Sequence, residues 1–508
     1  MASSGPATTG QRTADADAAA AATHDGLRLV RRVTRDRPRV PTVPSCVSYS
    51  AHLSAHPDLA QAAVDTVTGG AALGDHARAR AAAVGEAVER YCGNLVPDTL
   101  PVAPWSRLVR DGRDAVDPRE FALYSPAQHA RRGFPFVAMS PELPIGWVAG
   151  HDLADARQVL VPASLTYVNY FRGAHRSEPP TNYPLLAGTA AGATLEEARL
   201  AALREVLERD AVTLWWLSGA PATPLYPEAR PTRADAAGAL PAAAGATCSP
   251  ADLAAEADTS PVAPARTGPL AEALREAASA GLCVTLLSIP STFDVVVAGA
   301  FIEDPVRRLV AFGSACRATA DEAAAKALTE AVGTHETCLE LLDHEGDFWN
   351  AVRRGRAGRG PYRPHREDRA YLDDFRSDWR DVNDVRLHLQ VYLDPRTQDS
   401  RLDRLRFPGT ARYPRTVADA SGPAALDDHV RMLAEQGLRV VSVDLTAPEV
   451  RAAGFHVVRV LVPGLTCNAP AAFPFLGGRR LYHEPVARGW LPRPPREADL
   501  VLAPLPFS

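Results

Sequence analysis

Along this 508-residue chain, short apolar runs typical of β-strands alternate with longer segments in which apolar residues have helical spacing. This alternation restricts the folds that the chain can adopt. Short runs rich in valine, isoleucine and leucine predict two pairs of β-strands, at residues 284–290, 295–304, 438–446 and 455–465. Longer segments with apolar residues at every third or fourth position predict helices, at residues 76–91, 195–217, 319–342 and 425–436. Strands that alternate with helices favour an α/β or mixed α+β fold. No repeat of about 20–50 residues is present, which excludes a solenoid.

Compositional bias separates one long domain from several flanking or inserted segments. Residues 1–24 lack hydrophobic periodicity and are expected to be a disordered tail, so the domain is expected to span residues 25–495. An Ala/Pro-rich stretch at about residues 218–267 is expected to be a surface insertion. The polar stretch at about residues 353–384 resembles an RNA-binding tract at its start, but its balanced charge favours a solvated loop followed by an acidic helix. Residues 496–508 form a Pro-rich C-terminal tail.

Lysine is almost absent from the chain. Lysine and arginine together number 55, and Lys326 is the single lysine, a bias typical of a GC-rich bacterial genome. A P-loop needs a Gly-Lys-Ser/Thr sequence and a protein kinase needs a lysine in a strand, whereas Lys326 lies in AAAKALTE. If the protein uses a nucleotide, it must therefore bind it without a P-loop.

Charge and cysteine usage exclude further classes of protein. The formal net charge of −5 gives no electrostatic footprint for nucleic acid, and no apolar run approaches the ~18 residues of a membrane span. The first residues do not form a secretory signal. The cysteines are odd in number and never form CxxC, which fits a reduced cytoplasm and argues against a zinc site or disulfide framework; they are Cys46, Cys92, Cys248, Cys283, Cys316, Cys338 and Cys467.

The sequence E-x-x-E-R occurs twice, once in each of the first two predicted helices. The two copies comprise Glu86, Glu89 and Arg90, and Glu205, Glu208 and Arg209. Positions three apart share a helix face, so each copy presents two carboxylates side by side. The second helix extends this row to Glu197, which together with Thr194 also forms a capping box at the helix start.

Two interpretations of these copies remain open. Glutamate and arginine commonly occupy solvated helix faces, so each copy alone is an ordinary surface pattern. However, small and apolar residues flank both copies. If the two helices face one another, their carboxylates supply the hard oxygen ligands of a divalent cation, and Mg²⁺ bound in this way usually also takes phosphate oxygens. The arginines could then neutralise carboxylates or contact phosphate.

Several segments together resemble the YcaO family, and specifically its azoline-forming cyclodehydratase branch. They are GEAVERYCG, AAGATLEEARLAALREVLERDAVTLWW, FGSACRATADEAAAKALTEA, VDLTAPEV, VVRVLVPGL and APAAFPFLGGRR, in family order over residues 69–480. The resemblance implies a mixed α/β, ATP-binding fold without a P-loop. It also implies that ATP and Mg²⁺ activate a backbone amide of a ribosomally made precursor peptide, so that a Cys, Ser or Thr side chain closes a thiazoline or oxazoline ring.

The resemblance also implies roles for particular residues. The implied metal ligands are Glu86, Glu89, Glu205 and Glu208, and the implied ATP-binding residues are Glu86, Arg90, Glu197, Arg209, Lys326 and Glu330. The branch often ends in a PxPxP tail near the catalytic centre. Here the chain ends with Pro504, Pro506 and Ser508, which are the implied catalytic-tail residues. Proline pre-sets an extended backbone, so such a tail can enter a pocket with less entropy loss.

This chain departs from the family pattern at several positions around the implied site. Ala82 stands where many members have serine, and the stretch AALGD stands where many have GKG. Ala190 and Ala193 replace small polar residues before the long helix. The carboxylates are kept while neutral polar contacts are lost, which is compatible either with fewer contacts to the nucleotide or with weakened use of ATP.

The expected function is therefore that of a cytoplasmic cyclodehydratase in peptide natural-product (thiopeptide-like antibiotic) biosynthesis. The alternatives are ATP-dependent backbone thioamidation and a degenerate scaffold that binds the peptide or an active partner. No leader-binding module is evident before the domain, so a separate E1-like or leader-recognition protein is expected to deliver the precursor peptide. An azoline dehydrogenase is a further expected partner, and the chain is expected to form a homo- or hetero-oligomer.

Overall fold

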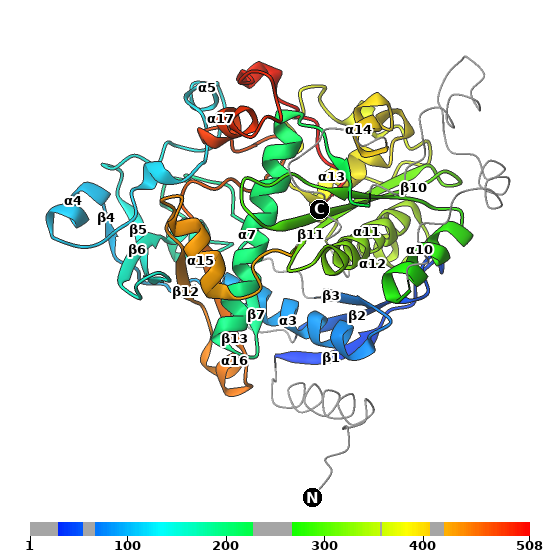
Figure 1. Ribbon diagram of the computed structural model, residues 1–508, viewed down its shortest axis with the longest axis horizontal. Helices are drawn as coiled ribbons and strands as arrows, with labels where there is room; N and C mark the ends of the chain where they lie inside the picture. Colours follow the sequence, from blue (N-terminus) through cyan, green and yellow to red (C-terminus); the bar gives the residue numbers. More distant parts are fainter. Residues whose placement is uncertain (1–28, 54–66, 227–266, 356–357, 407–420, 508) are drawn as a thin grey trace, which may run out of the picture.

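The computed structural model describes residues 29–53, 67–226, 267–355, 358–406 and 421–507, which form a mixed arrangement of helices and antiparallel sheets (Figure 1). The mixed α/β fold predicted from the alternation is confirmed. The predicted tail at 1–24 lies outside the described residues, as does most of the predicted insertion. Residues 218–226 of that stretch belong to the fold, because they end the second long helix and form a short strand.

Three separate sheets form the framework of the described part of the chain, and every pairing between their named strands is antiparallel. The first contains β1 (Val30–Arg35), β2 (Cys46–Leu53) and β3 (Val67–Leu73). The second has the order β11-β10-β9-β8, from Leu309–Arg317, Val296–Asp304, Cys283–Ser288 and Thr223–Pro224. The third has the order β4 (Val102–Ala103), β5 (Ile145–Asp152), β12 (Val441–Asp444), β13 (His456–Leu461) and β7 (Thr189–Gly192). Strand β6 (Gln158–Pro162) also pairs with β5.

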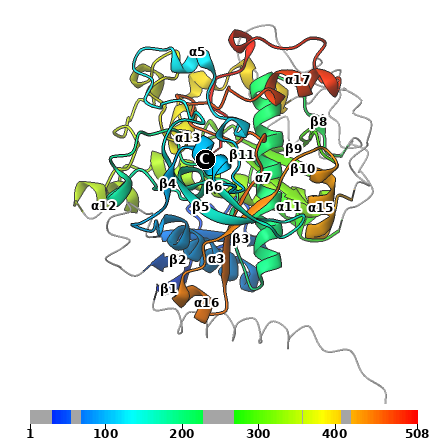
Figure 2. The ribbon, with the colours of Figure 1, turned by 90° about the vertical axis from the view of Figure 1, so that its left-hand side faces the viewer.

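Each sheet is covered by one long helix. Helix α3 (His76–Asn94) packs on β2 and β3, α7 (Leu195–Ser218) on β7 and β13, and α11 (Ala320–Leu342) on β10 and β11. Figure 1 shows α7 in the middle of the molecule, with β12 on one side and β11 and α11 on the other, and Figure 2 shows it from a second direction. Because α7 also contacts β11 and α3 also contacts β7, the three units join around α7.

The predicted helices and strands are found close to their predicted bounds. Asp75, Thr194 and Thr319 accept backbone hydrogen bonds at the starts of the three long helices, and the capping box of Thr194 and Glu197 is present. The fourth predicted helix is α15 (Leu426–Ala434), and the four predicted strands are β9, β10, β12 and β13. The remaining helices are α4 (Trp105–Arg110), α5 (Pro126–His129), α6 (Ala163–Thr166), α10 (Pro269–Ser279), α12 (Asp347–Arg353), α13 (Arg386–Tyr392), α14 (Asp403–Arg406), α16 (Pro448–Ala452) and α17 (Arg480–Ala487).

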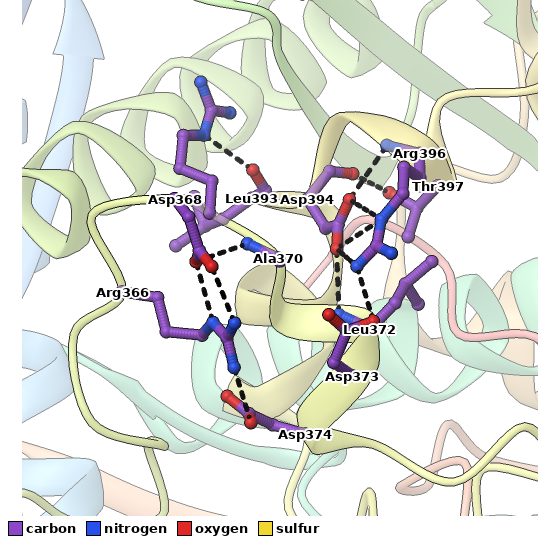
Figure 3. Close-up of polar contacts among 11 residues, drawn as sticks. Arg366, Asp368, Ala370, Leu372, Asp373, Asp374, Leu393, Asp394, Arg396 and Thr397 are labelled. Carbon is purple, nitrogen blue, oxygen red and sulfur yellow. Dashed lines mark hydrogen bonds and ion pairs between the residues drawn. The ribbon is translucent and has the colours of Figure 1, made fainter.

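The polar stretch at 353–384 does not form the predicted acidic helix. Over its described residues it contains turns and a single 3₁₀ turn, Tyr371–Asp374. Figure 3 shows that Arg366 bridges Asp368 and Asp374, while Arg396 joins Asp373 to Asp394. Aspartate accepts bonds from backbone N–H groups nearby, and such bonds favour turns over a helix interior. The acidic residues therefore cap turns.

No helix among the described residues is long and apolar enough to cross a membrane. Six cysteines lie within the described ranges and are free thiols, Cys92, Cys316 and Cys338 being buried as expected for small apolar side chains. Cys248 lies outside the described residues.

Candidate functional site

The two E-x-x-E-R copies meet at β7. Glu89 of α3 accepts a hydrogen bond from the backbone N–H of Ala191 (2.8 Å). Glu205 of α7 accepts one from the N–H of Gly188 (2.8 Å), just before the strand begins. Because one short segment binds a carboxylate from each helix, residues from two distant helices are fixed in one place.

The carboxylates lie close enough to affect one another's ionisation. Burial raises the pKa of Glu89 well above its usual value, and the neighbouring charges of Glu86 and Glu205 raise it further. Burial also raises the pKa of Glu205, and Glu208 and Glu86 act in the same direction. Solvent still reaches the side chain of Glu205, which is 31% exposed. The site therefore has accumulated negative charge that an added cation would relieve.

The second carboxylate of α7 is held from the opposite sheet. Glu208 is 5% exposed and accepts bonds from the hydroxyl of Ser314 (2.7 Å) and the N–H of Cys316 (3.1 Å), both on β11. The Arg209 guanidinium donates to Glu208 (2.9 Å) and to Ser314 (3.2 Å), and it lies 3.8 Å from Glu205. Burial opposes the charge of Arg209, but Glu208 and Glu205 outweigh it and raise its pKa.

The other implied ATP-binding residues lie on α3, α7 and α11. Arg90 pairs with Glu86 (2.8 Å), and Lys326 pairs with Glu330 on α11. The charges of Lys326 and Arg209 lower the pKa of Glu330 against the opposing effect of burial, so this part of α11 lies near Arg209. Glu197 is exposed and its carboxylate accepts the N–H groups of the capping box at the start of α7.

A fully buried arginine organises the segment that leads into β7. Arg459 of β13 donates to the carbonyl oxygens of Leu165 (3.2 and 3.1 Å), Ala187 (2.7 Å) and Leu185, and to the hydroxyl of Thr189 (2.8 Å). Gly188 lies inside this segment with a positive φ of 94°, and a Cβ there would lie 2.6 Å from the carbonyl oxygen of Val460. Arg459 and Gly188 together set the position of the Gly188 N–H, which donates a hydrogen bond to Glu205.

The C-terminal segment reaches the same region. Its main-chain oxygens accept bonds from Trp216 (to Ala503, 2.8 Å), from Tyr392 (to Pro504, 2.6 Å) and from the N–H of Phe312 (to Pro506, 2.8 Å). The ring of Phe507 lies over the Arg209 guanidinium at 4.4 Å. Pro504 and Pro506 are thus near the site, and Ser508 lies outside the described residues.

The donor set suits a magnesium–nucleotide pair better than a bare metal ion. Within the described ranges, no three His, Cys, Asp or Glu side chains are arranged to hold a metal ion by themselves. Mg²⁺ typically binds one or two carboxylates and completes its shell with water and phosphate oxygens. The accumulated carboxylates with raised pKa values on two facing helices fit that mode.

The family match agrees with this arrangement. The pattern of the family described as YcaO cyclodehydratase, ATP- and Mg²⁺-binding, matches residues 70–466. The chain belongs to the YcaO family, whose cofactors are ATP and Mg²⁺. No curated protein sequence matches the chain.

Solved structures share the fold. A heterocyclase in complex with substrate and cofactor is 21% identical, with a TM-score of 0.64, over 96% of this chain and 57% of its own. The chain thus spans little more than half of that heterocyclase. YcaO from Methanopyrus kandleri, bound with AMPPCP and Mg²⁺, is 18% identical, with a TM-score of 0.50, over 90% of this chain and 92% of its own.

Residues that the sequence did not single out complete the site. Ser314 and Cys316 hold Glu208, and Arg459 holds the segment before β7. Ser314 lies in the FGSACR sequence that carries the family resemblance, so a polar residue within a buried strand was the available signal. Arg459, a charged residue inside an otherwise apolar strand, gave a similar signal.

Proposed function

We propose that this protein is an ATP- and Mg²⁺-dependent cyclodehydratase component that converts Cys, Ser or Thr residues of a ribosomally made precursor peptide to thiazoline or oxazoline. The observation that supports it most directly is the meeting of the two E-x-x-E-R copies at β7, with Arg209 and the C-terminal segment beside them. Family membership supports the use of ATP and Mg²⁺.

In this proposal the acidic residues of α3 and α7 hold the metal and the charged residues around them hold the nucleotide. The metal ligands would be Glu86, Glu89, Glu205 and Glu208, and the ATP-binding residues Glu86, Arg90, Glu197, Arg209, Lys326 and Glu330. Arg209 is already fixed by Glu208 and Ser314, so its charge is positioned before phosphate arrives. The ion pairs of Glu86 with Arg90 and of Glu330 with Lys326 would reorganise when phosphate enters.

The chemistry is that of an amide oxygen leaving as phosphate. The thiol or hydroxyl of the peptide adds to the preceding carbonyl carbon, and its proton is lost. Bound ATP supplies the phosphoryl group that turns the former amide oxygen into a leaving group, and departure of phosphate with loss of the amide proton forms the C=N bond. The chain's part is to orient the peptide and to stabilise charge on the transferred group.

The C-terminal segment is proposed to position the peptide at this centre. Pro504 and Pro506 present carbonyl oxygens that are held by α13 and β11, so their backbone is ordered next to Arg209. Ser508 is proposed to act with them as the third residue of the tail.

Further proteins are proposed to take part. A separate E1-like or leader-recognition protein would deliver the precursor peptide, and an azoline dehydrogenase would oxidise the product, all in the cytoplasm and within a homo- or hetero-oligomer. The similar heterocyclase was solved in complex with substrate and cofactor, which is consistent with a substrate bound at this site.

The test combines the purified chain, its leader-recognition partner, precursor peptide, ATP and Mg²⁺, and follows both peptide mass and phosphate. Loss of one water per modified residue with matching phosphate release is expected. A peptide that gains mass by exchange of oxygen for sulfur, once a sulfur donor is supplied, would identify backbone thioamidation instead.

A scaffold without catalysis is the second candidate, favoured by one specific observation. Glu89, Glu205 and Glu208 each already accept hydrogen bonds from protein N–H or O–H groups, and Ala82, Ala190 and Ala193 offer no polar contact to a nucleotide. Calorimetry with Mg²⁺ and a non-hydrolysable ATP analogue decides between them. Binding of the partner protein without binding of nucleotide would establish the scaffold.

A further inference from the structure

A pocket lies next to the site along α7. Its wall on α7 includes Val212, Thr213 and Trp216, which follow Arg209 by three, four and seven residues and so continue the same helix face. The pocket has a cavity volume of about 60 Å³ and is partly open to solvent. On an α-helix, four residues span ~6 Å, so the pocket begins one helical turn beyond Arg209.

The remaining walls come from segments distant in sequence. One is the C-terminal segment, whose Phe507 separates the pocket from Arg209. Another is the loop that includes Ala469 and Phe475. Among the residues that the structure describes, no Asp, Glu, Lys or Arg lines the pocket. Burial lowers the pKa of His388, which also lines it, to about 4, so this imidazole is neutral at neutral pH.

One of the residues that line the pocket, Thr213, carries a buried polar group. Thr213 is 7% exposed, and its hydroxyl has no hydrogen-bond partner in the structure. A buried hydroxyl without a partner costs about 1–3 kcal/mol, so such a group is usually satisfied by a ligand or by ordered water. In a pocket beside a peptide-modifying site, a peptide backbone N–H or C=O is a suitable partner.

We propose that this pocket binds the apolar side chain of the substrate residue that precedes the cyclised residue, and that the Thr213 hydroxyl bonds to the peptide backbone beside it. The inference rests on the proposed function, because it places the reacting carbonyl near Arg209. The side chain of the residue that carries this carbonyl is attached at the adjoining Cα, so a leucine-length side chain can extend from a carbonyl near Arg209 towards a pocket one helical turn away. The pocket thus selects for leucine-like residues and against charged ones at that position.

The experiment uses three precursor peptides that contain one cyclisable cysteine preceded by Leu, Gly or Asp. With the wild-type chain and a fixed amount of leader-recognition partner, kcat/KM is expected to be about tenfold higher for the Leu peptide than for the Gly peptide, and lowest for the Asp peptide. The variant Ala469→Phe fills the pocket. It is expected to reduce kcat/KM for the Leu peptide to the value for Gly while leaving the Gly peptide within twofold.

Two more variants separate pocket filling from other effects. Ala453→Phe adds the same ring at another partly exposed alanine that does not line the pocket, so it is expected to leave the preference for Leu unchanged. Thr213→Val keeps the shape but removes the hydroxyl, and is expected to raise the KM of all three peptides about fivefold with little change in kcat. Thermal melting of each variant confirms that it is folded.

The failure of the pocket and the failure of the proposed function give different results. Equal kcat/KM for the Leu and Gly peptides, or an equal loss for both in Ala469→Phe, overturns the pocket assignment. If the wild-type chain modifies no peptide, fluorescence anisotropy of the labelled Leu and Gly peptides still tests the pocket. A preference for Leu that Ala469→Phe abolishes supports it, and equal affinities reject it.

Discussion

Arg459 carries a full charge into the interior of the protein, where it is 0% exposed. Its guanidinium makes five hydrogen bonds to four neutral oxygen atoms, and burial lowers its pKa to about 10, so it stays charged at neutral pH. Three of these oxygens belong to the segment 185–189, which presents the Gly188 N–H to Glu205. One residue thus connects the packing of β13 to the geometry of the acidic site.

Replacement of Arg459 by methionine should therefore destabilise the protein strongly. The buried carbonyl oxygens would lose their donors, at a cost of about 3 kcal/mol in the free energy of unfolding. Urea denaturation measures this loss. Arg431→Met, at an exposed ion pair with Asp428, serves as the control and should change stability by less than ~0.5 kcal/mol. Equal effects of the two substitutions would contradict the role assigned to Arg459.

The raised pKa of Glu205 predicts that its charge destabilises the cation-free protein. For a carboxyl whose folded-state pKa lies above the unfolded value, the contribution to stability is present below the unfolded pKa and is lost as the pH rises through the folded pKa. With a chelator at pH 8, Glu205→Gln should raise Tm by about 1–3 °C, and the difference should shrink towards pH 4. The same variant should lose about 100-fold or more in turnover. A lower Tm for Glu205→Gln at pH 8 would show that its carboxylate is stabilising by itself.

At the scale of elements, helices were predicted more reliably than the site they build. Long amphipathic patterns and the capping residue Thr194 are local signals, so the bounds of α7 agree with the prediction to within about one residue. The N–H partner of Glu89 lies on β7 and that of Glu205 just before it, and this four-residue strand is too short to show periodicity. The prediction of an acidic helix within 353–384 was wrong, because the aspartates there cap turns. Local patterns therefore predict elements, whereas the contacts between sheets that complete the site do not follow from them.

Helix α13 positions the C-terminal segment through Tyr392, whose hydroxyl donates to the Pro504 carbonyl (2.6 Å). Tyr392→Phe keeps the ring but leaves this buried carbonyl without a donor, so stability should fall by about 1 kcal/mol. If the segment positions the peptide, ring formation should slow about threefold to tenfold while the KM for ATP is unchanged. Tyr482→Phe removes a comparable hydroxyl-to-carbonyl bond, to Leu476, and is the matched control. A proportional change in the KM for ATP would instead assign Tyr392 to the nucleotide site.

At the scale of the whole molecule, α3, α7 and α11 bring carboxylates from three sheet units to one place. The pattern that recurs most widely elsewhere is Asp-x-Arg, in which the aspartate accepts both the backbone and side-chain N–H groups of an arginine two residues on. It occurs at Asp117, Asp155, Asp384, Asp394 and Asp399. Those pairs in which both side chains are exposed contribute little to stability, whereas the Asp394 carboxylate is buried. The exposed pairs agree with the interpretation that most of the arginine usage reflects codon bias.

Because the site joins separate units, a bound ligand should stabilise the whole molecule. Mg²⁺ together with a non-hydrolysable ATP analogue at 100 times Kd should add about 2.7 kcal/mol to the free energy of unfolding. Either component alone should add much less, since carboxylates and phosphate oxygens are both needed to complete the metal's shell. Differential scanning calorimetry measures the change, and Glu205→Gln should abolish it. A full shift with Mg²⁺ alone would indicate a metal site made only of protein groups.

The burial of the C-terminal segment also affects the order in which the chain folds. Val501 binds the Leu217 carbonyl and Ala503 accepts from Trp216, across sequence separations of nearly three hundred residues. Contacts that close such long loops form late and slow the folding of a chain. We therefore expect the core around α7 to close on this side only when residues 500–507 dock, so that until then Trp216 would be accessible to chaperones or to other unfinished chains.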